Sequence, residues 1–153
     1  MKLHAFPSPR SEGEQSGAGG LALFAMMAAA EVCEGAPSAQ AQGFFAAIGR
    51  RMATLEPLEG VSDAAVLCAR INGFWQDLGW GEIELAVGDD AIVVHHRNLP
   101  KALASDQQGS WNTMMLGLLQ GAYDAWFRVL GSGPALHTVA QWQGDVIELR
   151  HGR

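Results

Sequence analysis

The sequence predicts an α+β fold with the order N-terminal helices, β-hairpin, long α-helix and second β-hairpin. Apolar residues recur at spacings of three and four before residue 80 and again over residues 111–130, whereas the period changes to two over residues 82–97 and 136–150. Because helices and strands are segregated in this way, we expect a small antiparallel sheet with helices packed on it. The chain has 153 residues, of which 48% are hydrophobic and 17% charged, and this composition suits one compact domain.

The first 20 residues are rich in Gly, Pro, Ser and Glu. Such a composition cannot bury enough apolar area to offset the entropy of ordering, so we expect a flexible N-terminal arm over residues 1–20 and a single domain over residues 21–153. The apolar run 21–30 is shorter than the roughly 20 residues of a membrane span. It resembles the core of a signal peptide, but Glu12 and Glu14 precede it closely. We expect no direct membrane insertion and a cytoplasmic location, with the periplasm as the alternative.

Three helices are expected before the first strand. The first covers residues 21–34, the second starts near Ser38 and ends before Pro57, and the third begins after Ser62 and ends at Gly79. Ser38 and Ser62 are N-cap candidates, because a serine hydroxyl can accept a hydrogen bond from a free N–H of the first helical turn.

A β-hairpin follows, with a turn at Asp89 and Asp90. A turn centred there matches apolar to apolar and charged to charged positions across the two strands. The expected register places Val87 opposite Ile92, Leu85 opposite Val94, Glu84 opposite His95, and Glu82 opposite Arg97.

The strongest helical pattern covers residues 111–130, with Ser110 as the expected N-cap. Its apolar stripe is wide enough to cover a sheet and to meet a second copy of the chain. Gly131 and Gly133 end the helix, and two alternating segments, 136–142 and 146–150, form the last hairpin.

Net charge and cysteine usage exclude several classes of protein. The formal charge of −6 provides no basic field for nucleic acid or for an anionic membrane. Cys33 and Cys68 lack the spacing of zinc or redox sites, and we expect two buried thiols. No cofactor is expected.

The pattern of histidines and aspartates does not favour a metal site. His95 and His96 are adjacent in a strand, so their side chains point to opposite faces and cannot easily share one ion. Asp89 and Asp90 resemble an acidic pair that holds a divalent ion, but turn chemistry explains them better.

Glu82 and Glu84 are the main catalytic candidates. They share one face of a strand, as the acid and base of a glycosidase do. Pairing with Arg97 and His95 would instead make a solvated cross-strand charge ladder, which we prefer. The sequence contains no nucleophile paired with a base and no glycine-rich phosphate loop after a strand. We therefore expect a protein that is not an enzyme.

Several short motifs together resemble the family of cellulose synthase D subunits of bacterial cellulose operons, in the family's order and nearly its spacing over residues 21–130. The matching residues are Leu23, Phe24, Ile48, Gly49, Arg50, Met52, Leu78, Gly79, Trp80, Gly81, Val94, His95, Asn98, Leu99, Pro100, Gly109, Ser110, Trp111, Leu116, Leu119, Gly121, Tyr123 and Trp126. We interpret the motif residues at positions 79–81, 98–100 and 110–111 as structural.

The resemblance implies a non-catalytic accessory component of bacterial cellulose biosynthesis. In this family the protein forms a homo-octamer, a ring-shaped tetramer of dimers that encloses passageways for nascent β-1,4-glucan chains. It would organise chains or synthase complexes for ordered cellulose export and crystallisation, in contact with other subunits of the synthase. The family's passageways are lined by N-terminal segments, which makes Lys2, His4, Phe6 and Arg10 the candidate glucan contacts.

Two other functions stay open. Helices followed by hairpin, helix and hairpin also occur in small-molecule-binding sensor modules. A β-glucan-active enzyme that uses Glu82 and Glu84 is the second alternative.

Overall fold

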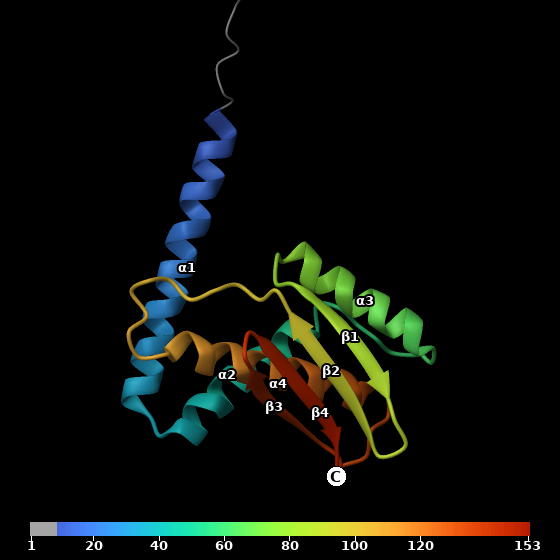
Figure 1. Ribbon diagram of the computed structural model, residues 1–153. Helices are drawn as coiled ribbons and strands as arrows, with labels where there is room; N and C mark the ends of the chain where they lie inside the picture. The colour runs from blue at the N-terminus through green and yellow to red at the C-terminus, as the bar shows by residue number, and fades with distance from the viewer. Residues whose placement is uncertain (1–8) are drawn as a thin grey trace, which may run out of the picture.

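The computed structural model describes the backbone of residues 9–153 and the side chains of residues 17–153. It contains helices α1 (Pro9–Gly35), α2 (Ser38–Ala53), α3 (Ala64–Asp77) and α4 (Ser110–Val129), and strands β1 (Glu82–Val87), β2 (Ala91–Arg97), β3 (His137–Gln143) and β4 (Val146–Gly152). This order of helices, hairpin, long helix and hairpin confirms the predicted α+β class (Figure 1).

The four strands form one antiparallel sheet in the order β1-β2-β4-β3. The first hairpin has the predicted register, with Val87 opposite Ile92, Leu85 opposite Val94, Glu84 opposite His95, and Glu82 opposite Arg97. The second hairpin joins the first through β2 and β4, so that both hairpins share one core-facing side.

Helices cover one face of the sheet. α3 packs on β1, α4 packs on β3 and β4, and α2 lies against α4 on the side away from the sheet (Figure 1). The core between these layers contains the fully buried side chains of Trp75, Tyr123 and Trp126. The opposite face of the sheet carries polar side chains, among them Glu84 and Arg97.

α2 and α4 approach each other closely at glycines. A Cβ atom at Gly49 would lie 1.9 Å from the Leu118 carbonyl oxygen, and one at Gly121 would lie 2.0 Å from the Ala46 carbonyl oxygen. No larger residue fits at either position without moving a backbone, so these glycines set the distance between the two helices.

α1 begins earlier than the sequence pattern predicts. The helix starts at Pro9 rather than near residue 21, so the predicted boundary is wrong. Glycines at positions 17, 19 and 20 lower helix propensity without forbidding a helix. Only the C-terminal part of α1 packs on the body, where Met26 and Ala29 are buried.

The predicted serine caps are also wrong. α2 begins after Pro37 with no side-chain cap, and the carboxylate of Asp63 accepts from the Val66 N–H at 2.9 Å at the start of α3. At α4 the Asp106 carboxylate accepts from the N–H of Ser110 and that of Trp111. A carboxylate is favoured over a hydroxyl at these ends because its charge also interacts with the helix dipole.

The apolar run of α1 is longer than the run 21–30 alone. Within the described residues, Gly17–Gly35 is long and apolar enough to cross a membrane, with a mean hydropathy of 1.3 and 11% of the segment buried. This is weak support for a span, since a signal sequence near the N-terminus has the same length and composition.

Candidate functional site

The corner between α3 and β1 brings together residues of two sequence motifs. Gly79 has φ +68°, Gly81 has φ +86° and Asn98 has φ +57°. Asn98 is the only residue other than glycine with positive φ in the part of the chain that the structure describes. At Gly81 a Cβ atom would lie 1.9 Å from the Arg97 carbonyl oxygen. The corner therefore requires glycine for both conformation and space.

Trp80 packs into this corner. Its ring stacks on that of the fully buried Trp75, with centroids 5.7 Å apart and planes at 4°. One face of Trp80 is thus covered by a core residue, and the side chain as a whole is half-buried. This geometry suits a residue that closes the corner better than one that offers its ring to a sugar.

A buried hydrogen-bond chain fixes the corner to α4 and β2. Trp75 Nε1 donates to the Tyr123 hydroxyl at 3.0 Å, that hydroxyl lies 3.3 Å from His96 Nδ1, and His96 Nε2 lies 2.7 Å from the Trp80 carbonyl oxygen. Because a carbonyl only accepts, Nε2 carries the proton and Nδ1 accepts from Tyr123.

Burial keeps the two titratable side chains of this hydrogen-bond chain, His96 and Tyr123, neutral. It lowers the pKa of His96 from 6.5 to about 4, against the hydrogen bond to Trp80, and raises the pKa of Tyr123 well above 10. Both nitrogens of His96 are therefore committed to the fold. Among the described residues, no group of three or more His, Cys, Asp or Glu side chains could hold a metal ion.

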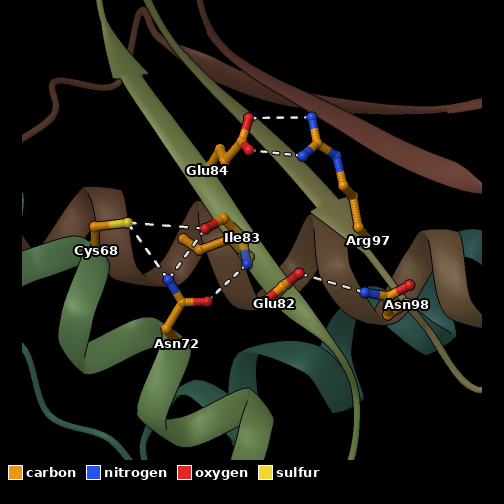
Figure 2. Close-up of polar contacts among 7 residues, drawn as sticks. All are labelled: Cys68, Asn72, Glu82, Ile83, Glu84, Arg97 and Asn98. Atoms are coloured by element: carbon orange, nitrogen blue, oxygen red, sulfur yellow. Dashed lines mark hydrogen bonds and ion pairs between the residues drawn. The ribbon is translucent and has the colours of Figure 1, made fainter.

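Asn72, on α3, binds the backbone of β1 (Figure 2). Its Nδ2 donates to the Ile83 carbonyl at 3.1 Å, and its Oδ1 accepts from the Ile83 N–H at 2.7 Å. Cys68 Sγ lies 3.5 Å from the same Nδ2. Asn72 was not predicted as a site residue. The signal that could have identified it is a polar amide within an apolar helical segment. Cys68 and Cys33 were predicted to be buried, but both are only half-buried.

Glu82 and Glu84 lie exposed on β1 and take part in polar pairs (Figure 2). Glu84 accepts two hydrogen bonds from Arg97, at 2.6 and 3.1 Å, and Glu82 lies 3.4 Å from Asn98 Nδ2. The register is as predicted, but the expected side-chain pairs Glu84–His95 and Glu82–Arg97 are wrong. The long Arg97 side chain reaches Glu84 diagonally, and His95 pairs with Glu148 on β4. The arrangement is a solvated charge ladder, and it differs from the apolar pocket that a glycosidase general acid requires.

The end of β2 is connected to the start of α4. Leu99 is buried, and the Pro100 carbonyl accepts a hydrogen bond from Trp111 Nε1 at 3.0 Å. Trp111 and Ser110 are both buried, so this second group of motif residues lies inside the fold.

The structure describes only one of the four candidate glucan contacts at the N-terminus, and only its backbone. Lys2, His4 and Phe6 lie outside the described residues. Arg10 lies in the first turn of α1, and its side chain is likewise outside the described part.

The comparisons with known proteins agree with the motif pattern. The family model for the D subunit of cellulose synthase matches residues 15–152, which include the second hairpin beyond the motifs recognised in the sequence. A search of curated proteins gave no match. The match covers nearly the whole chain, and the protein therefore belongs to the family of cellulose synthase D subunits, with a role in cellulose biosynthesis.

Proposed function

We propose that the protein is a non-catalytic accessory component that assembles into a ring-shaped homo-octamer, a tetramer of dimers. The ring guides nascent β-1,4-glucan chains, or organises synthase complexes, for ordered export and crystallisation of cellulose. It acts in the cytoplasm, in contact with other synthase subunits. Membership of the family of cellulose synthase D subunits supports this assignment.

The observation that carries the proposal is the exposed apolar surface of α1. Leu21 and Phe24 are 72% and 71% exposed, and Leu23 and Met27 are also exposed. Over residues 21–30 the exposed side of the helix is as apolar as the side that packs on the body. A helix that is apolar all round is normally buried, so α1 requires a cover that a single copy of the chain fails to provide.

α2 extends this apolar surface. Phe44 and Ile48 are exposed on α2, which contacts the C-terminal part of α1. The free face of the sheet is different, because it carries the Glu84–Arg97 and His95–Glu148 pairs. The N-terminal helices are therefore the surface best suited to a second copy of the chain.

Sedimentation of the purified protein tests the proposal. We expect the wild-type chain to sediment as an octamer and Phe24→Glu to sediment as a smaller species, because a buried carboxylate opposes apolar contact. Val87→Glu is the matched control, since Val87 is also exposed, at 61%, but lies on the first hairpin. A monomeric wild-type protein, or equal loss of assembly in both variants, would contradict the proposal.

The proposed location and lack of catalysis have direct tests. A fluorescent protein that matures only in the cytoplasm, fused to the C-terminus, is expected to fluoresce in cells that make cellulose. Cellotetraose incubated with the purified protein is expected to remain intact. Failure of the first would place the protein in the periplasm, and hydrolysis that Glu84→Gln abolishes would favour the enzyme alternative.

A further inference from the structure

A cavity of about 660 Å³ opens at the end of the helix–sheet core, where residues at the C-terminal end of β4 line it. It lies between the β1–β2 turn, the segment that follows α4, and the end of β4. Ile92, Phe127 and Leu130 give it apolar walls. No motif in the sequence and no part of the proposed function accounts for this cavity.

Two of its lining residues have buried polar atoms without a hydrogen-bond partner. His151 is 2% exposed, and its Nε2 has no partner among the described residues. The hydroxyl of Ser132 is in the same state, and both residues line the cavity. A buried polar atom without a partner is destabilising, so two of them at one cavity indicate a place where a ligand supplies the missing hydrogen bonds.

The neighbours of His151 determine which of its nitrogens carries the proton. The Asp124 carboxylate pairs with Arg128 at 2.9 Å and accepts from the Thr138 hydroxyl at 3.2 Å. The Thr138 oxygen, 2.8 Å from His151 Nδ1, must then accept from Nδ1–H. Burial lowers the pKa of His151, with weaker opposing and supporting effects from nearby charges, and the ring is neutral at pH 7. Nε2 is therefore an acceptor that lacks a donor.

The rim of the cavity carries charges of both signs. Asp89 and Asp90 line it with carboxylates, and Arg150 and Arg153 also line it. The carboxyl end of α4 lies beside it, so the rim has no net charge that would select an anion or a cation. No metal-binding group of three or more side chains occurs in the described chain, which argues against a cation held by His151. Balanced charges of this kind suit a neutral ligand that presents hydroxyl groups, which can donate to the carboxylates and accept from the guanidinium groups, and that has an apolar face to lie against Phe127 and Ile92.

We propose that this cavity binds a saccharide, with one sugar hydroxyl donating to His151 Nε2 and another group bonding to the Ser132 hydroxyl. Sugars combine several hydroxyl donors with apolar ring faces, and the volume admits more than one sugar residue. The choice of a β-1,4-glucan as the sugar rests on the proposed function, whereas the position of the site rests on the geometry alone. The cavity would hold a glucan end on the body of each copy of the chain, apart from α1.

Titration of the full-length protein with cellobiose, followed by nitrogen NMR of the histidine rings, tests this site. We expect the His151 Nε2 signal to have the shift of an unprotonated nitrogen and to move on addition of cellobiose. Ser132→Ala should weaken binding by about three- to tenfold, as expected for loss of one hydrogen bond. Ser62→Ala is the matched control, because Ser62 is exposed and lies outside the cavity. It should bind cellobiose as the wild type does.

His151→Phe keeps a ring in place but removes the acceptor, and it should abolish cellobiose binding. Ser132→Ala keeps the test decisive if His151→Phe does not fold. The proposal is overturned if the Nε2 signal does not move, if glycerol moves it as much as cellobiose does, or if Ser132→Ala and Ser62→Ala bind equally. Cellobiose-dependent changes confined to α1 would overturn this site and leave the octamer, measured separately by sedimentation, intact.

Discussion

A single hydroxyl group, that of Tyr123, joins three elements of the fold. It accepts from Trp75 on α3 and donates to His96 on β2, while Tyr123 itself lies on α4. The apolar spacing of the third helix predicts Trp75 in the core, and its burial agrees. The hydrogen-bond chain was not predictable, because its members are separated by up to 48 residues and depend on how the elements pack.

At Gly81, substitution should be far more costly than at its neighbour Gly79. We expect Gly81→Ala to lower the free energy of unfolding by roughly 3 kcal/mol or more, because the new Cβ meets the Arg97 carbonyl oxygen and the backbone has positive φ. Gly79→Ala has the positive φ without a neighbour within 4 Å, and should lower it by about 1–2 kcal/mol. Urea unfolding of both variants measures the difference, and equal losses would show that space at Gly81 is unimportant.

His96 should make the fold sensitive to mild acid. Its pKa is about 4 in the folded chain and 6.5 in the unfolded chain, so the unfolded state takes up a proton first as the pH falls. Stability should therefore be constant with respect to this group above pH 6.5 and fall by about 3 kcal/mol between pH 6.5 and pH 4.

Urea unfolding at a series of pH values measures this effect. The variant His96→Gln is the control, since its amide can donate to the Trp80 carbonyl and accept from Tyr123 without titrating. The wild type should lose more stability than His96→Gln over this range. Parallel losses would assign the acid sensitivity to other groups, such as His151, whose pKa burial also lowers.

At the scale of elements, the local patterns were predictable and the helix ends were not. The register of β1 and β2 follows from alternation and a turn at Asp89 and Asp90, which are features of neighbouring residues. The start of α1 and the caps of the other helices depend on small differences between adjacent polar residues, such as Ser62 and Asp63. The cavity was beyond prediction, because it forms only where three elements distant in sequence meet.

Gly121, in the close contact of α2 and α4, can be compared with Gly73, which has free space around it in α3. Gly121→Ala should lower the free energy of unfolding by about 3 kcal/mol, because its Cβ would lie 2.0 Å from the Ala46 carbonyl oxygen. Gly73→Ala, in α3 with nothing within 4 Å, should instead raise it by about 0.5–1 kcal/mol through helix propensity. Chemical denaturation checks both signs, and a tolerated Gly121→Ala would mean that the two helices can move apart.

At the scale of the whole molecule, the apolar surface and the cavity lie in different regions. The exposed residues of α1 belong to a helix that projects from the body (Figure 1). The cavity is instead lined by residues at the C-terminal end of β4 and by the segments that follow β1 and α4. Composition predicted the need for a partner only in general terms, through an excess of apolar helix surface. That α1 provides this surface follows from its long exposed course, which the glycine-rich sequence does not indicate.

If copies of the chain cover α1, thermal stability should depend on protein concentration. A tenfold increase in concentration favours association by about 1.4 kcal/mol per step, which should raise Tm by about 3 °C for a domain of this size. Phe24→Glu should remove this dependence and Val87→Glu should retain it. Scanning calorimetry at two concentrations gives the answer, and a wild-type Tm that does not change with concentration would count against an interface between copies on α1.

The bond pattern of Asn72 also limits how copies of the chain can meet. β1 is an edge strand, and the outward N–H and carbonyl of Ile83 are the groups with which a strand of another molecule would pair. The Asn72 amide occupies both, as a neighbouring strand would. At Ile83 this edge is thereby closed to a strand of another molecule, so copies of the chain cannot join their sheets edge to edge through this residue.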